Sequence, residues 1–227
     1  MEVVKPVKRN ILLNPGPATT SDAVKYAQVI PDICPREQEF VDVMTGVRKD
    51  LVKVVHGDPE KYTSVIFAGS GTIVQDVLVN SLVPEGKKIM VVNNGAYAAR
   101  MVKIAKFYHI DCVDLQFSTT GLPDLAKVKK AIEEDKDIAV VAAVHHETGT
   151  GVLNPIREIG KMAHDNDCIF IVDTISTYGL RPIDIEEENI DFLMSSAQKG
   201  LAAMTGASWT VGNIKAIEKS KDYPTRS

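Results

Sequence analysis

The feature that most constrains this fold is an alternation of short apolar runs with longer amphipathic segments, which begins after Tyr62. The length and β-branched content of the apolar runs predict strands, and the 3.6-residue periodicity of the longer segments predicts helices. Each helical segment is long enough to cross from one parallel strand to the next. The alternation therefore predicts an α/β domain with a buried, mainly parallel sheet flanked by helices.

We expect seven strands in this sheet, at residues 64–68, 88–92, 111–115, 138–144, 169–172, 192–195 and 208–211. The crossover helices are expected at residues 72–82, 96–108, 125–134 and 156–166. Two further helices precede the sheet, at 22–29 and 40–55, with Ser21 placed to cap the first and His56-Gly57 to end the second. We expect these two helices to cover one edge of the domain.

Composition narrows the classes of partner and compartment. A formal net charge of −4 without a basic block argues against a nucleic-acid partner. The longest apolar stretch, 138–144, is far shorter than the ~20 residues that cross a bilayer, and the first residues lack the apolar core of a signal peptide. Because Cys34, Cys112 and Cys168 are scattered, we expect neither a disulfide framework nor a zinc cluster, and we expect a cytoplasmic protein.

Ligands of open α/β sheets bind beyond the carboxyl ends of the strands, so the polar residues that follow each strand are the candidates for a site. Gly69-Ser70-Gly71-Thr72 lies between a predicted strand and a predicted helix. Its backbone amides and hydroxyls would suit a phosphate at the helix N-terminus. The run is neither a Walker motif nor a dinucleotide fingerprint, so a tight turn without a ligand is the alternative.

Two chargeable residues also follow strands. Asp173 comes directly after 169–172, where a buried carboxylate needs a partner such as a protonated ring nitrogen. The alternatives are that it caps a helix or pairs with Arg181. Lys199 follows the strand at 192–195 among small residues, where it is either an amine that bonds covalently to an aldehyde or a solvated surface cation.

The run from His145 to Gly151 follows a further strand. Adjacent histidines on an extended segment point in opposite directions, so we expect no metal here but a loop whose hydroxyls face a ligand. Tyr97 begins a helix after another strand, and its ring either packs or stacks on a ligand. A phosphate, a protonatable ring nitrogen and an aldehyde are together the functional groups of pyridoxal phosphate (PLP).

Several longer motifs carry a family resemblance. They are Asn14-Pro15-Gly16-Pro17 with Thr19-Thr20, Tyr62-Thr63-Ser64-Val65, Gly69-Ser70-Gly71-Thr72, residues 94–101, His146-Glu147-Thr148 with Thr150-Gly151, and Ile171-Val172-Asp173. Through them the sequence resembles class V aminotransferases of PLP fold type I over essentially its whole length. Residues 94–101 are most similar to the branch of that family that acts on 2-aminoethylphosphonate and pyruvate.

The resemblance implies a domain organisation. Residues 1–20 would form an N-terminal arm on the substrate side, and residues 21–227 the PLP-binding large domain. Members of the family assemble as homodimers and continue into a C-terminal small domain, which supplies a substrate-binding arginine. The sequence stops at Ser227 before that domain, so we expect the small domain to be absent.

The resemblance also implies roles for individual residues. Lys199 would bond to the cofactor aldehyde and carry a proton, and Asp173 would pair with the pyridinium nitrogen. The cofactor phosphate would be held by Ser70, Gly71, Thr72 and Gln198, the ring faces by Tyr97 and Ile175, and the phenolic oxygen by Thr148. The substrate side would include Pro15, Gly16 and Arg36, and no residue is expected to hold a metal.

The implied activity is transfer of the amino group of 2-aminoethylphosphonate to pyruvate, which gives phosphonoacetaldehyde and alanine. Gln198 departs from the asparagine expected in that branch and is shared with the alanine:glyoxylate branch. Transfer from alanine to glyoxylate, or from serine, is therefore an alternative. A catalytically incomplete PLP-binding fragment is a further alternative. In each case the expected partners are small molecules, an amino donor and a 2-oxo acid, together with a second copy of the chain.

Overall fold

A computed structural model describes residues 10–226 of the chain, and its centre is a seven-stranded sheet with the order β1-β9-β8-β7-β4-β2-β3. The strands are β1 (Tyr62–Ala68), β2 (Lys88–Asn93), β3 (Cys112–Gln116), β4 (Ile138–Val144), β7 (Ile169–Asp173), β8 (Phe192–Ser196) and β9 (Ala207–Asn213). All the expected strands are present and lie within about two residues of the expected bounds. The α/β class and the mainly parallel sheet are confirmed.

Strand direction determines where a ligand site can form. The pairs β2/β3, β2/β4, β4/β7 and β7/β8 are parallel, whereas β9 runs antiparallel to both β8 and β1. All the strands of this sheet except β9 therefore point the same way. As a result, the segments that follow Ala68, Asn93, Val144, Asp173 and Ser196 all leave the sheet at one edge.

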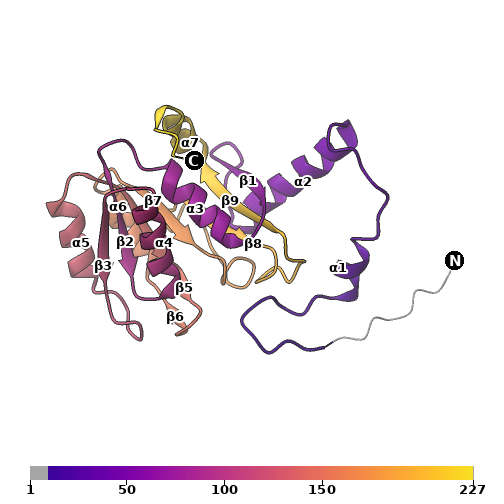
Figure 1. Ribbon diagram of the computed structural model, residues 1–227, viewed down its shortest axis with the longest axis horizontal. Coiled ribbons are helices and arrows are strands. Elements are labelled where there is room, and N and C mark those ends of the chain that lie inside the picture. The colour runs from indigo at the N-terminus through magenta and orange to yellow at the C-terminus, as the bar shows by residue number, and fades with distance from the viewer. Residues whose placement is uncertain (1–9, 227) are drawn as a thin grey trace.

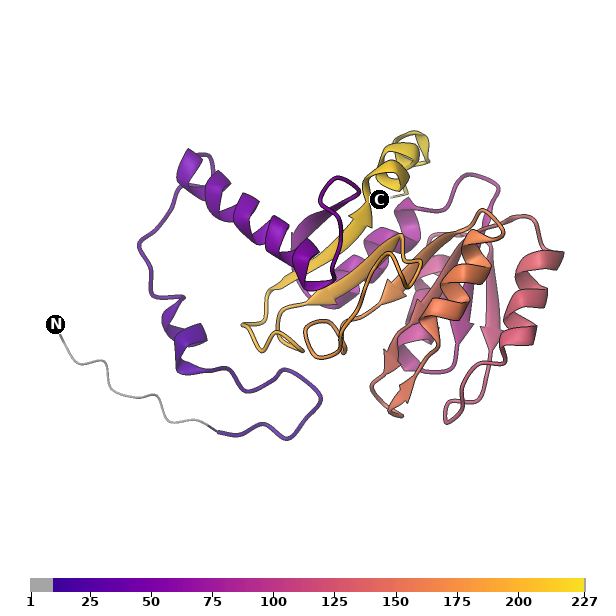
Figure 2. The same cartoon turned by 180° about the vertical axis from the view of Figure 1, so that it is seen from behind.

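Helices cover both faces of the sheet. Figure 1 shows α3 (Gly71–Ser81) and α4 (Ala96–Phe107) on the near face, and Figure 2 shows α5 (Leu125–Glu134) and α6 (Ile156–His164) on the other. These helices confirm the expected crossovers. The remaining elements are the β5–β6 hairpin (His146–Glu147, Val152–Leu153), α7 (Ile214–Lys219) and the 3-10 helix η1 (Ser220–Asp222).

The central strands alternate their side chains between two apolar cores. Val91 and Ile171 pack with residues of α3 and α4, while Met90 and Phe170 pack with residues of α5 and α6. All four side chains are fully buried. Burial on both faces explains why these strands read as continuous apolar runs rather than as alternating ones.

The two helices that precede the sheet depart from expectation. Helix α1 (Asp22–Tyr26) begins at Ser21, whose hydroxyl accepts a hydrogen bond from Val24 N, but it ends three residues early and buries no residue. Figure 1 shows α1 standing away from the sheet. The expectation that it covers an edge of the domain is therefore wrong.

Helix α2 (Gln38–Val54) reaches the domain only through its last turns, where Leu51 and Val52 are buried. It ends as expected, with His56 at a φ of 55° and Gly57 N donating to Val52 O at 3.1 Å. Its first turns project from the sheet in both Figure 1 and Figure 2. Only this second half of α2 covers the edge strand β1.

Residues 1–9 of the expected arm, and Ser227 at the end of the expected large domain, lie outside the described residues. Within 10–226, none of the helices combines the length and apolar character needed to span a bilayer. In the same part of the chain, no group of three or more His, Cys, Asp or Glu side chains is arranged to hold a metal ion.

Candidate active site

A pocket opens at the edge of the sheet where β4, β7 and β8 end. It is lined by Tyr97, Val144, His146, Thr148, Asp173, Ile175, Ser176 and Lys199. Five of these residues were predicted from the sequence: Tyr97, Thr148, Asp173, Ile175 and Lys199. They lie up to about a hundred positions apart in the chain, and the parallel strands bring them to one place.

Asp173 is the last residue of β7, and its carboxylate is buried. Its Oδ1 accepts a hydrogen bond of 2.9 Å from Ile175 N, and its Oδ2 accepts one of 2.6 Å from Gln75 Nε2. Within residues 10–226 these are its partners, so it does not form the alternative ion pair with Arg181. Burial raises the pKa of Asp173 to about 6, and the two hydrogen bonds act in the opposite direction.

Lys199 lies in the loop between β8 and β9, and this loop is held by a hydrogen bond within itself and by a close contact with Tyr178. Ala203 N donates to Ala197 O at 3.0 Å, and a Cβ on Gly200 would lie 2.1 Å from the Tyr178 carbonyl oxygen. The backbone at Lys199 is therefore held against the segment that follows β7. Lys199 is half-buried and is one of the residues that line the pocket.

The N-terminal arm passes directly beside Lys199. Lys199 Nζ donates a hydrogen bond of 3.5 Å to Gly16 O, and a Cβ on Gly16 would lie 2.2 Å from Lys199 Cδ. Ala18 N donates to Gln198 O at 2.8 Å. Gly16, and Pro15 before it in the chain, are thus brought to the pocket. Arg36 does not line the pocket and is exposed; the segment between α1 and α2, to which it belongs, stands away from the sheet in Figure 1.

The Ser70-Gly71-Thr72 turn forms the N-terminus of α3 next to this pocket. Ser70 is the N-cap residue, yet its hydroxyl makes no capping hydrogen bond. A Cβ on Gly71 would lie 2.4 Å from Ile175 Cδ1 and 3.4 Å from Ser196 Oγ. Position 71 therefore has room only for glycine, which lets Ile175 and Ser196 pack directly against the start of α3.

Arg100 joins the turn to the aromatic side of the pocket. Its Nη1 donates a hydrogen bond of 3.0 Å to Thr72 Oγ1, and its guanidinium carbon lies 5.0 Å from the centroid of the Tyr97 ring. The contact with Tyr97 is a cation–π interaction, and the hydrogen bond to Thr72 links the same guanidinium to the turn. A positive charge thus lies beside the proposed phosphate site.

The two histidines bond to different hydroxyls, as expected for neighbours on an extended segment. His145 Nδ1 lies 2.9 Å from Thr177 Oγ1, and His146 Nδ1 lies 3.0 Å from Ser176 Oγ. Burial, with a smaller effect of Arg181, lowers the pKa of His145 to about 4, so its ring is neutral at neutral pH. His146 faces the pocket, whereas His145 is part of the wall behind it.

Three buried polar atoms near the pocket have no hydrogen-bond partner among residues 10–226: Gln75 Oε1, Ser196 Oγ and Gln198 Oε1. An unsatisfied buried polar group costs about 1–3 kcal/mol, so such groups commonly meet a ligand or water. A buried carboxylate, a lysine in the pocket lining and the N-terminus of α3 complete the polar groups of the site. These residues fit a ligand with a phosphate, a protonated ring nitrogen and an aldehyde, as PLP has.

Sequence reasoning missed some of the residues found at the site. Gln75, His146 and Ser176 were assigned no role, and Arg100 was given no part in shaping the turn. The available signal for Gln75 is a polar residue on the apolar face of α3, next to the buried Val74 and near Leu78.

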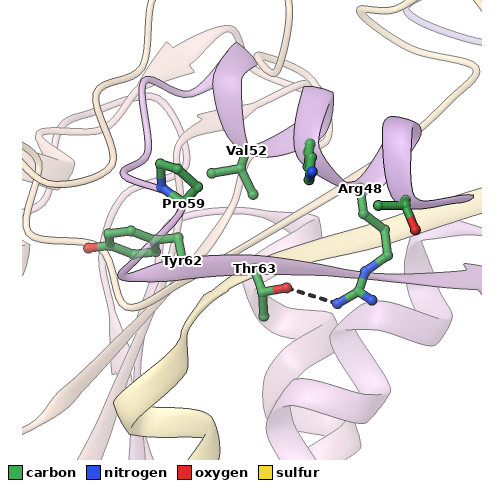
Figure 3. A pocket seen from close by; sticks show the side chains of 7 residues that line it. Arg48, Val52, Pro59, Tyr62 and Thr63 are labelled. Carbon is green, nitrogen blue, oxygen red and sulfur yellow. Dashed lines mark hydrogen bonds between the residues drawn. The ribbon is translucent and has the colours of Figure 1, made fainter. Parts of the chain in front are cut away.

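A second hollow lies between α2 and β1, and Figure 3 shows it from close by. It is lined by Thr45, Arg48, Lys49, Val52, Pro59, Tyr62 and Thr63. Arg48 Nη2 donates a hydrogen bond of 2.8 Å to Thr63 Oγ1, and Arg48 Nε donates one of 2.7 Å to Ser64 O. The hollow is at the amino end of β1, so it is separate from the strand-end pocket. Its arginine fastens α2 to the sheet.

Comparisons of the sequence with a family model and with known relatives indicate the same family. Residues 22–223 match the family model described as aminotransferase class-V. Over 211 residues, 93% of the chain, the sequence is 38% identical to a bifunctional phosphonoacetaldehyde hydrolase/aminoethylphosphonate transaminase of Clostridioides difficile strain 630. Over the same share it is 36% identical to a 2-aminoethylphosphonate–pyruvate transaminase of Bacillus cereus. The chain spans 33% of the first relative and 61% of the second.

Solved structures of this fold superpose closely. An alanine–glyoxylate aminotransferase from Nostoc sp. matches with a TM-score of 0.88 at 25% identity, over 99% of this chain and 59% of that one. A pyridoxamine–pyruvate aminotransferase from Mesorhizobium loti matches with a TM-score of 0.87 at 21% identity, over 96% of this chain and 55% of that one. The second likeness shows the fold alone.

Proposed function

The chain belongs to the class V aminotransferases, a PLP-dependent family, and from that premise we propose that it is the cofactor-binding part of a 2-aminoethylphosphonate:pyruvate aminotransferase. The reaction would give phosphonoacetaldehyde and alanine. The observation that carries the proposal is that Asp173 and Lys199 line one strand-end pocket together with Ile175, which packs against Gly71 at the N-terminus of α3. The names of the two relatives support the choice of amino donor.

When bound, PLP supplies an electron sink for the carbon that carries the substrate's amino group. Lys199 is proposed to hold the cofactor through its amine and then to move a proton at that carbon. Asp173 is proposed to hold a proton on the ring nitrogen, because its buried carboxylate at the end of β7 faces the pocket. Both residues would therefore touch the reacting system.

The remaining contacts orient the cofactor. We assign the phosphate to Ser70, Gly71, Thr72 and Gln198, the ring faces to Tyr97 and Ile175, and the phenolic oxygen to Thr148. The N-terminus of α3 supports the phosphate assignment, because the hydroxyl of its N-cap residue Ser70 makes no capping hydrogen bond. The positive charge of Arg100 would also favour a phosphate here, because its guanidinium donates a hydrogen bond to Thr72 at the same turn.

The substrate side is proposed to include Pro15 and Gly16, because the arm crosses Lys199. Arg36 is also proposed for the phosphonate, since a guanidinium pairs with such an anion through two parallel hydrogen bonds, and this role requires the exposed segment that carries Arg36 to move toward the pocket. Replacing Arg36 with alanine should then raise KM for the donor without changing the affinity for PLP.

One alternative is supported by a specific observation. Gln198 precedes the lysine, and the Nostoc alanine–glyoxylate aminotransferase superposes with a TM-score of 0.88. Alanine, or serine, would then be the donor and glyoxylate the acceptor. A PLP-binding unit that is catalytically incomplete is the other alternative.

A comparison of amino donors tests these proposals. The PLP-loaded chain is mixed with 2-aminoethylphosphonate, alanine or serine, and the absorbance of the bound cofactor is followed. We expect 2-aminoethylphosphonate to convert the cofactor fastest, and Lys199→Ala to abolish conversion. Conversion by alanine alone would assign the chain to the alternative branch. Bound PLP that no donor converts would indicate the incomplete unit.

We further propose that the protein assembles as a homodimer and works in the cytoplasm. The proposal of a dimer rests on membership of the family. The proposal of a cytoplasmic location rests on the free cysteines Cys34, Cys112 and Cys168. Size measurement of the purified chain by light scattering tests the first of these proposals.

A further inference from the structure

Gln75 is an unusual residue for the position that it occupies. It lies on the sheet-facing side of α3, is 0% exposed, and has the buried Val74 and Leu78 as neighbours on the same helix. Its Nε2 donates a hydrogen bond of 2.6 Å to Asp173 Oδ2. Its Oε1 is buried, and no residue in 10–226 bonds to it.

Packing alone does not account for an amide here. Burying a polar group without a partner opposes folding, and an apolar side chain of similar length would fill the same space without that penalty. The compensating interaction is the hydrogen bond to a carboxylate, which is shorter and stronger than one between neutral groups. The unsatisfied oxygen of Gln75 therefore costs stability, and the hydrogen bond that the same side chain donates to Asp173 offsets that cost.

The geometry at Asp173 shows what that contact achieves. Ile175 N holds Oδ1 at 2.9 Å from the backbone side, and Gln75 holds Oδ2 from α3. The carboxylate plane is thus fixed from two directions. Each oxygen has a second lone pair, so the group can still accept a hydrogen bond from a ligand in the pocket.

We propose that Gln75 is a positioning residue for Asp173, which orients the carboxylate toward the ring nitrogen of the cofactor and favours its charged form. This inference deepens the proposed function and rests on it. Gln75 does not touch the pocket itself, because it is absent from the residues that line it. It acts on the cofactor through Asp173.

Other charges also face Asp173 and have to be held constant in any test. Glu147, from the hairpin after β4, opposes its ionisation, and Arg100, from α4, favours it. Lys199 and His146 line the same pocket. None of these four residues hydrogen-bonds to Gln75, so a substitution at position 75 leaves them in place.

The first test uses the cofactor-free chain. The carboxyl carbon of Asp173 is followed by 13C NMR during a pH titration and is assigned by its loss in Asp173→Asn. Because Gln75 donates to the charged form, we expect Gln75→Leu to move the titration midpoint of Asp173 upward by about one pH unit or more. The matched control is Asn80→Leu, which removes another buried amide from α3 that does not contact Asp173.

The second test uses the chain loaded with PLP that carries 15N in its ring. We expect the ring nitrogen of Gln75→Leu to lose its proton at a lower pH than in the wild type, while Asn80→Leu behaves as the wild type. If Gln75→Leu does not fold, Gln75→Met is used, since its unbranched side chain fills the same space without a donor.

The two measurements separate the inference from the proposed function. If the Asp173 midpoint in the cofactor-free chain is the same in the wild type and in the position-75 variant, the inference is overturned, whatever PLP does. If the midpoint moves upward only in the position-75 variant, the inference holds for the carboxylate. A wild-type chain that takes up no PLP overturns the proposed function, and the role of Gln75 is then decided by the cofactor-free titration.

Discussion

Glu147 accepts a hydrogen bond of 3.0 Å from the backbone amide of Ala98, so a residue from the β5–β6 hairpin caps helix α4. The same carboxylate accepts a longer bond, 3.4 Å, from Tyr97 N. The residue is 1% exposed, and a Cβ on Gly95 would lie 2.3 Å from Glu147 Cδ. Gly95 therefore makes room for the carboxylate, and the carboxylate fixes the turn that carries the Tyr97 ring.

Removing this cap should destabilise the fold. We expect Glu147→Ala to lower the free energy of unfolding by about 2 kcal/mol, because the buried amides of α4 lose a charged acceptor. Glu147→Gln keeps an acceptor oxygen and should lie between the wild type and the alanine variant. Urea unfolding measures both. Glu133→Ala, which removes an exposed carboxylate from α5, is the control, and an equal loss there would contradict this account.

Arg100 should contribute to cofactor binding without being needed for folding. Arg100→Met keeps the apolar stem but loses the bond to Thr72 and the cation over Tyr97. We expect the dissociation constant for PLP to rise about 5-fold, which corresponds to about 1 kcal/mol. Fluorescence titration measures it. Lys103→Met, on an exposed position of the same helix, is the matched control, and equal affinities in both variants would contradict this role.

The pair of His164 and Asp191 should make stability depend on pH. His164 Nε2 lies 2.9 Å from Asp191 Oδ2, and this hydrogen bond raises the pKa of His164 above its ordinary 6.5. Its stabilisation is therefore fully present below the unfolded pKa and is lost as the pH rises through the higher folded value. Since the histidine side chain is 39% exposed, solvent limits the effect to about 0.5 kcal/mol.

His164→Gln isolates this contribution. Asp191 is left in place because its Oδ2 also accepts a hydrogen bond of 2.8 Å from Phe170 N. We expect the wild type to exceed the variant in unfolding free energy by more at about pH 5.5 than at about pH 8.5. A difference that grows with pH would show that the sign is wrong.

Two glycines should respond in opposite ways to alanine. A Cβ on Gly200 would meet the Tyr178 carbonyl oxygen at 2.1 Å, so Gly200→Ala should cost about 3 kcal/mol and displace the Lys199 loop. Gly46, inside α2, has nothing within 4 Å of its Cβ position, so Gly46→Ala should stabilise the chain by about 0.5–1 kcal/mol. Thermal unfolding of both variants tests the pair. Equal shifts would contradict the contact at Gly200.

The strand-end residues were predictable because the signal is local. Asp173, Thr148 and Lys199 each follow an apolar run, and in a parallel sheet that position alone brings them to one edge. Gln75 was not predictable in the same way, since its partner lies 98 residues away and the contact depends on how α3 packs over β7. The sequence marks it only as a polar residue on an apolar face.

For helices α1 and α2, the sequence did not predict which part of the fold each helix packs against. The periodicity of α2 predicts an apolar face through Phe40, Met44, Val47 and Leu51. Leu51 is buried and Phe40 and Met44 are half-buried, but Val47 is 43% exposed. Periodicity predicts which residues share a face and says nothing about which element covers it. The last turns of α2 pack on the sheet at β1 through Leu51, Val52 and Arg48.

The central claim is that Lys199 is the residue that holds PLP. An absorbance titration of the chain with PLP, followed by borohydride reduction and mass mapping of the modified residue, tests it most directly. We predict saturable binding with one reduced adduct on Lys199, which is lost in Lys199→Ala while inorganic phosphate still competes for the turn at Ser70-Gly71-Thr72. An adduct on another lysine, or label scattered over surface lysines, would contradict the assignment.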